Sequence, residues 1–119
     1  MRNLKIFLIA LAALSVLGCS TAYKSLTASM PNMSLMANGV YRGEYDVSAT
    51  PVKVVLDVTV QGRQITEINI VRHNSSPIGK RAERIIDQII EEQSLDIDVI
   101  SGATASSKAI LKAVENALQ

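Results

Sequence analysis

Residues 52–71, which read VKVVLDVTVQGRQITEINIV, determine the architecture of this chain. The first half of this stretch is rich in β-branched side chains, as strands are. Its apolar residues alternate onto one face, as in a half-buried strand: Val52, Val54, Leu56, Val58 and Val60. Gln61-Gly62-Arg63 predicts a tight turn, and residues 65–71 predict the next strand. Two strands joined by so short a turn must pair antiparallel.

The flanking segments extend this hairpin into a layered fold. Alternation over residues 40–47 predicts a strand before it. After Pro77 the apolar spacing becomes helical and predicts an amphipathic helix over residues 79–93. Val99 and Ile100 predict a short fourth strand, and residues 105–119 predict a second amphipathic helix. The expected fold is α+β: an antiparallel three- to four-stranded sheet packed by two helices, in the order β-β-β-α-(β)-α.

Composition excludes several classes of function. With 119 residues, the chain has room for one domain. A net charge of +1 and an aromatic content of 3% disfavour nucleic acid as a partner. One histidine and one cysteine exclude both a zinc site of the usual Cys/His kind and an internal disulfide.

The first 18 residues have the pattern of a secretory signal peptide. A short basic start precedes residues 6–17, an uncharged run too short to cross a bilayer. Val16-Leu17-Gly18-Cys19-Ser20 resembles the lipobox of bacterial lipoproteins. The resemblance implies cleavage before Cys19 and lipidation of Cys19, with anchoring at the extracytoplasmic face of the cell membrane or the outer membrane. The alternatives are an ordinary cleaved signal with an incidental cysteine, or an uncleaved anchor.

Residues 19–37 have the composition of a flexible tether between the lipidated Cys19 and a domain at residues 38–119. From Ser20 onward they are mostly small, polar and methionine residues, with Lys24 as the one charge. The alternative is that part of this segment, residues 23–26 or 33–36, packs on the domain.

The segment before the last helix is the strongest candidate site. Its hydroxyl side chains are all able to cap a helix start: Ser101, Thr104, Ser106 and Ser107. Gly102 permits a left-handed backbone or a close approach to a ligand. Because the first N–H groups of a helix lack internal partners, such a place can bind a phosphate. The alternative is an ordinary cap and turn.

The order of residues in this segment adds a resemblance. Asp98-x-x-Ser101-Gly102-Ala103-Thr104 resembles the flavinylation motif of the FMN-binding domain family, which includes the C subunit of the sodium-pumping NADH:quinone reductase and the G subunit of the Rnf complex. Residues 38–43 and 58–68 resemble the opening strand and the strand-turn-strand of that family.

This resemblance implies a covalent cofactor. An ApbE-type flavin transferase would move FMN from FAD onto Thr104, forming a phosphoester bond. Asp98 would be the acidic residue of the motif, while Ser101, Gly102 and Ala103 would shape the loop. Ser106 and Ser107 follow at the helix start and complete the candidate cofactor-binding residues.

The implied function is electron transfer. The protein would be a membrane-anchored, extracytoplasmic flavoprotein that receives electrons from a membrane redox partner. This favours a redox carrier over a stand-alone enzyme, because the chain shows no second constellation for a substrate. The alternative is a module of the same fold without covalent flavin, with a ligand-binding, structural or sensory role.

His73, the single histidine, follows a predicted strand. It is interpreted either as polar surface or as a contact to the flavin ring or phosphate. No acidic residue can be placed beside it from the sequence, so a Ser-His-Asp hydrolase is the least favoured class.

Overall fold

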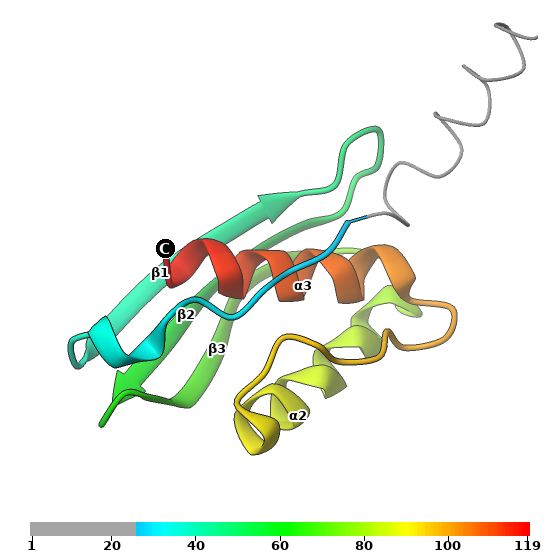
Figure 1. The fold of residues 1–119 in the computed structure, drawn as a ribbon. Helices are drawn as coiled ribbons and strands as arrows, with labels where there is room; N and C mark the ends of the chain where they lie inside the picture. Colours follow the sequence, from blue (N-terminus) through cyan, green and yellow to red (C-terminus); the bar gives the residue numbers. More distant parts are fainter. Residues whose placement is uncertain (1–25) are drawn as a thin grey trace, which may run out of the picture.

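The structure, a computed structural model, describes residues 26–119 and confirms the α+β fold (Figure 1). A short 3-10 helix precedes three strands, and a second 3-10 helix separates the strands from two α-helices. In chain order the elements are η1 (Met33–Leu35), β1 (Gly39–Asp46), β2 (Lys53–Gln61), β3 (Gln64–Asn74), η2 (Gly79–Arg84), α2 (Ile85–Glu92) and α3 (Thr104–Ala117).

The three strands form one antiparallel sheet in the order β1-β2-β3. The predicted hairpin is confirmed: Gln61 pairs with Gln64, and the two turn residues, Gly62 and Arg63, have φ of 60° and 65°. Two positive φ angles give the turn whose twist matches that of paired strands. The alternating residues of β2 are fully buried, each with 0% of its surface exposed: Val54, Leu56, Val58 and Val60.

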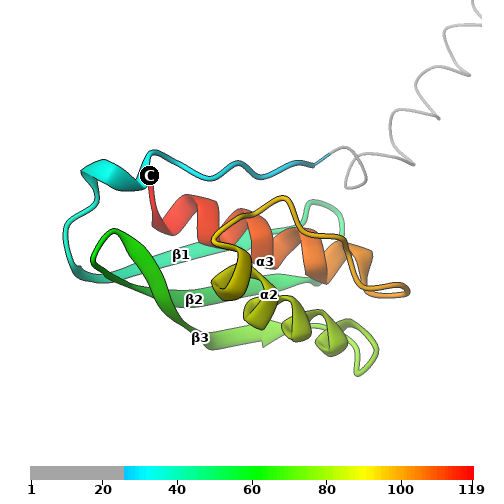
Figure 2. The same ribbon diagram turned by 60° about the horizontal axis from the view of Figure 1, so that its bottom comes forward.

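The optional fourth strand at Val99 and Ile100 does not form, and the sheet has three strands, which is within the expected range. Residues 94–103 form a loop on the helical side of the sheet (Figure 2), so they do not extend an edge of the sheet. The Ile100 N–H group donates to Ser107 Oγ at 3.0 Å, and Val99 lines a hollow beside α3. The apolar side chains of this loop are therefore covered by α3 rather than by a neighbouring strand.

The helix predicted over residues 79–93 is divided. Its first part winds as the 3-10 helix η2, with i→i+3 bonds such as Arg81 N–H to the Ile78 carbonyl at 3.1 Å. α2 then runs from Ile85 to Glu92 and ends at Gln93, whose φ is 50°. The apolar face is kept, since Ile85 and Ile89 are fully buried.

Both helices cover the same face of the sheet (Figures 1 and 2). α3 packs on β1 and β2, while α2 lies against β3. The approach of α3 to β1 is closest at Gly43. A Cβ atom built there would overlap the Ala113 carbonyl oxygen and lie 2.6 Å from the Ala117 nitrogen. β1 therefore contacts the backbone of α3 directly at this point.

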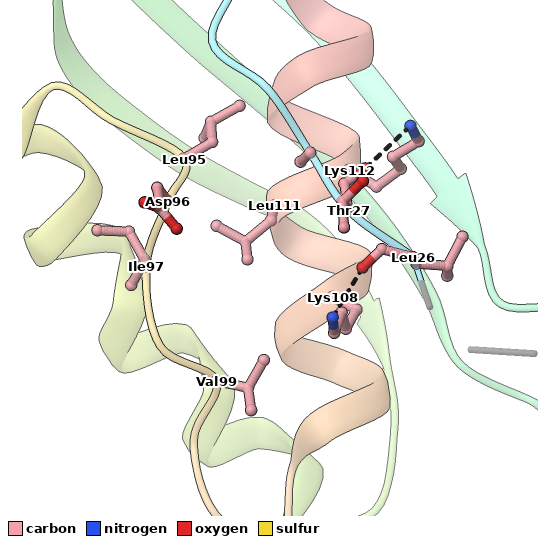
Figure 3. Close-up of a pocket in the computed structure, with 10 residues that line it drawn as sticks. Leu26, Thr27, Leu95, Asp96, Ile97, Val99, Lys108, Leu111 and Lys112 are labelled. Atoms are coloured by element: carbon pink, nitrogen blue, oxygen red, sulfur yellow. Dashed lines mark hydrogen bonds between the residues drawn. The ribbon is translucent and has the colours of Figure 1, made fainter. Parts of the chain in front are cut away.

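Residues 26–38, here called the strap, run along α3 on its side away from the sheet (Figure 2). Met33 and Met36 pack on the core, which bears out the alternative that residues 33–36 dock on the domain. Figure 3 shows the start of the strap, where Lys108 Nζ donates to the Leu26 carbonyl at 2.7 Å and Lys112 Nζ donates to the Thr27 carbonyl at 3.4 Å. A hollow of about 110 Å³ lies here between strap, α3 and residues 95–99.

Cys19 and the predicted signal peptide lie outside the described residues. Across residues 26–119, no helix has the length and apolar character needed to cross a membrane.

Glu115, a residue of α3, binds the strap through a hydrogen bond. It is 7% exposed, and its carboxylate accepts from Lys112 Nζ at 2.6 Å and from the Ser29 N–H at 2.7 Å. The hydrogen bond from Lys112 and then that from Ser29 lower the pKa of Glu115 below its ordinary value of 4.5. A lowered pKa in the docked state means that the ionised form stabilises docking. That contribution is present above pH 4.5 and is lost as the pH falls through the lower pKa.

We therefore expect the strap to loosen in acid. Hydrogen exchange at the Ser29 amide should accelerate as the pH falls below 4.5, beyond the intrinsic pH dependence of exchange. Glu115→Gln should lower the protection of this amide at neutral pH by about tenfold or more, because a charge-assisted bond is lost. Glu67→Gln, at an exposed position on β3, is the matched control. Unchanged Ser29 protection in Glu115→Gln would contradict this role.

Candidate functional site

A hollow of about 330 Å³ opens beside Thr104, the first residue of α3. It lies between the start of α3 and the loop that follows β3. The residues that line it are Val52, Ser75, Ser76, Gly79, Gly102, Ala103, Thr104, Ala105 and Ser106. Thr104 is half-buried, and the N-cap residue Ala103 gives no side-chain cap to the first turn. The first N–H groups of α3 are thus left for other acceptors.

The loop before α3 is held in shape by local hydrogen bonds. Gly102 has a φ of 80°, as its predicted left-handed role requires, and the Ala103 N–H donates to the Ile100 carbonyl at 2.9 Å. Ser107 is fully buried, and its hydroxyl donates to the Ala103 carbonyl at 2.7 Å while accepting from the Ile100 N–H. Ser107 therefore ties the loop to the helix.

The structure brings together some of the predicted cofactor-binding residues. Gly102, Ala103, Thr104 and Ser106 line the same hollow. Asp98 does not line it. Its exposed side chain borders a separate groove, which is rich in carboxylates and is lined by Gln88, Glu91, Glu92, Asp96, Ile97, Asp98, Val99 and Ile100. Ser101 lies on the exposed turn between the two.

The opposite wall of the hollow was not predicted. It consists of Ser75, Ser76 and Gly79, from the loop between β3 and α2. The Gly79 N–H donates to Ser76 Oγ at 3.1 Å. A Cβ atom at Gly79 would overlap Ser75 Oγ and lie 2.9 Å from Ser106 Oγ, so glycine lets these two hydroxyls meet. The signal for this wall was the Ser-Ser-Pro-Ile-Gly sequence after His73.

His73 is buried, with 7% of its surface exposed, so the interpretation as polar surface is wrong. Its Nδ1 lies 2.8 Å from Glu83 Oε2, and its Nε2 lies 3.0 Å from Ser106 Oγ. Ser106 Oγ in turn lies 2.9 Å from Ser75 Oγ. We call Glu83, His73, Ser106 and Ser75 the polar chain. It leads from a partly exposed carboxylate, through buried groups, to the wall of the hollow.

An acid does therefore stand beside His73, contrary to expectation. The order Glu83–His73–Ser106 is that of a hydrolytic triad, but Ser106 is 2% exposed inside α3. The Ser106 hydroxyl is held between His73 Nε2 and Ser75 Oγ, so it is placed to relay a hydrogen bond, and its low exposure disfavours a role as nucleophile.

The hollow suits an anion more than a metal ion. The nine lining residues offer hydroxyl and backbone N–H donors, and none of them is acidic. Within residues 26–119, no group of three His, Cys, Asp or Glu side chains is placed to hold a metal ion. Hydroxyl donors beside the start of a helix are the donor set that a phosphate group needs.

Comparison with known proteins identifies the family. The model of the FMN-binding domain matches residues 49–119. An uncharacterized protein of Treponema pallidum (strain Nichols) is 37% identical over 86 residues, which cover 71% of this chain and 23% of that protein. An NADH:acrylate oxidoreductase of Vibrio harveyi is 61% identical over 36 residues, covering 30% of this chain and 4% of the relative. The matched region thus spans less than a quarter of either relative.

The family match covers more than half of the chain, including β2, β3, both helices and the hollow beside Thr104. The chain belongs to the FMN-binding domain family.

Proposed function

We propose that the protein is a membrane-anchored, extracytoplasmic electron carrier with FMN joined to Thr104 by a phosphoester bond. One observation carries this proposal. Thr104 opens a helix of 14 residues at a hollow lined by hydroxyl groups, within the motif Asp98-x-x-Ser101-Gly102-Ala103-Thr104. The positive end of the α3 dipole would stabilise the phosphate charge there.

The attachment step needs a hydroxyl nucleophile on this chain and FAD as the donor. The Thr104 oxygen forms a new bond to the phosphorus of the FMN half, the pyrophosphate bond breaks, and AMP leaves. The hydroxyl proton of Thr104 is lost in the same step. An ApbE-type flavin transferase would supply the remaining catalytic groups, because the residues lining this hollow include no acid and no histidine.

Bound FMN supplies one- and two-electron redox chemistry, and this chain holds and positions it. The match to an NADH:acrylate oxidoreductase supports a redox role for the module. A lipid on Cys19 would keep the flavin at a membrane surface, where a membrane reductase is the proposed electron donor.

Intact-protein mass spectrometry on native, membrane-extracted protein tests this function. We expect one FMN on the peptide that contains Thr104, and acyl chains on a new N-terminus at Cys19. The same chain expressed without a flavin transferase is the control and should lack the flavin mass. Unmodified Thr104 in the native host, on a folded chain, would instead favour a binding or sensory module without covalent flavin.

A further inference from the structure

The polar chain has no part in the motif at residues 98–104, yet it ends at the same hollow. Glu83 begins it with a side chain that is 38% exposed, whereas the His73 side chain is 2% exposed. Ser75 ends it on the wall of the hollow. Buried polar groups that are fully hydrogen-bonded fix one arrangement of a site. The orientation of the Ser75 hydroxyl is therefore set from the far end of the chain.

The protonation state of His73 determines the direction of each hydrogen bond in the polar chain, up to the wall of the hollow. The Glu83 carboxylate accepts a hydrogen bond from His73 Nδ1, so this nitrogen carries a hydrogen. In the structure, Ser106 Oγ donates to Ser75 Oγ. When His73 is neutral, Nε2 accepts from Ser106, which uses the one hydroxyl hydrogen of Ser106, so Ser106 accepts from Ser75 instead. The oxygen of Ser75 then presents lone pairs to the hollow. When His73 is protonated, Nε2 donates to Ser106, Ser106 donates to Ser75, and the Ser75 hydrogen is free to donate into the hollow.

Among residues 26–119, the charged side chain in contact with the His73 ring is that of Glu83, on η2. α3 faces the ring with Ser106, and Val54 is its partner in the register of β2. The cations of these elements have other recorded partners or are exposed. Lys53 pairs with Asp46, Arg72 donates to Asn74 Oδ1, and Lys108 and Lys112 donate to the carbonyls of Leu26 and Thr27. Arg63, Lys80, Arg81 and Arg84 are exposed. Protonated His73 and an anion in the hollow thus favour each other through the two serine hydroxyls.

We propose that Ser75 donates a hydrogen bond to the phosphate of FMN at Thr104, and that Glu83, His73 and Ser106 are positioning residues for that hydroxyl. This inference rests on the proposed function. It assigns a phosphate-binding role to residues outside the flavinylation motif. It also makes the surroundings of the phosphate depend on the protonation of one buried histidine.

Phosphorus NMR of the flavin-loaded full chain in detergent tests the proposal. A phosphodiester keeps a single negative charge around neutral pH, so its ³¹P shift reports only its surroundings. Because the chain has one histidine, the ¹⁵N imidazole signals belong to His73. As the pH is varied, the ³¹P shift should change in one step together with the imidazole signals.

Substitutions distinguish an effect relayed through the polar chain from a direct electrostatic effect of His73 on the phosphate. In Ser106→Ala the ³¹P step should disappear, because the relay is interrupted. His73→Gln should also abolish the step. Ser94→Ala makes the same chemical change in a loop away from the hollow and should retain it. A flat ³¹P shift in the wild-type protein, or a step that survives Ser106→Ala, overturns the proposal.

A second arm does not depend on covalent flavin. Protein without flavin is titrated with inorganic phosphate at about pH 6. Ser75→Ala should bind phosphate about tenfold or more weakly than the wild type, because one hydrogen bond to a charged group is lost. Ser94→Ala should bind phosphate like the wild type. Equal affinities overturn the inference even if Thr104 carries FMN. If Thr104 carries none, the proposed function fails, and this titration still tests the polar chain.

Discussion

Thr104→Ala should give a folded, colourless protein when it is produced together with a flavin transferase. The substitution removes the hydroxyl that forms the phosphoester, so covalent flavin should fall to background. Stability should change by no more than about 0.5 kcal/mol, since Thr104 is half-buried at a helix start and alanine favours helices. Flavin fluorescence in a denaturing gel measures attachment, and circular dichroism with thermal unfolding measures the fold.

Two further variants serve as controls for this result. Thr104→Ser keeps a hydroxyl at the same place and should retain attachment. Thr66→Ala removes a threonine hydroxyl from the exposed surface of β3 and should be loaded like the wild type. A Thr104→Ala protein that still carried covalent flavin would place the bond on another residue and refute the assignment.

The largest effect on stability is expected for Gly43→Ala. The added methyl group would overlap the Ala113 carbonyl oxygen and lie 2.7 Å from the Ala117 Cβ atom. Both are parts of α3 that cannot rotate away, so the helix must shift off β1 or the strand must bend. Overpacking of this kind costs about 3 kcal/mol or more. Urea unfolding followed by circular dichroism should show a clearly lower midpoint.

Gly39→Ala is the matched control, because it adds the same methyl group to the same strand. There the nearest atom is a ring carbon of Tyr41 at 3.7 Å, an ordinary contact. Its unfolding midpoint should stay near that of the wild type. Similar midpoints for both variants would mean that α3 does not approach β1 as closely as described.

The sheet could be predicted because its information is local. Alternation along β2 and the glycine turn after it determine which residues face inward and how the strands pair. The fourth strand had to stay an open option, because two apolar residues, Val99 and Ile100, carry no periodicity. Val99 lies beside α3 and the strap, and the Ile100 N–H group donates to Ser107 on α3, which no pattern within the loop reveals.

Only one wall of the candidate site could be predicted, because only that wall is formed by residues that adjoin one another in the sequence. Residues 101–104 adjoin one another in the chain, and a motif is enough to single them out. The other wall comes from residues 75–79, and the contact from His73 to Ser106 joins positions 33 apart. A lone histidine in a sequence gives no sign of the carboxylate and hydroxyl that a fold will place on its two nitrogens. Only the packing of β3, η2 and α3 provides them.

The docking of the strap limits how far the flavin could travel. Leu26 is held by Lys108, one turn of α3 beyond Thr104, so the strap begins at the same end of the domain as the hollow beside Thr104. With a lipid on Cys19, only six residues would lie between the lipidated residue and Leu26, and the seven steps from Cys19 to Leu26 reach about 25 Å at full extension. Redox partners would then have to present their own centres close to the membrane surface, and a distant soluble acceptor would have to come to the protein.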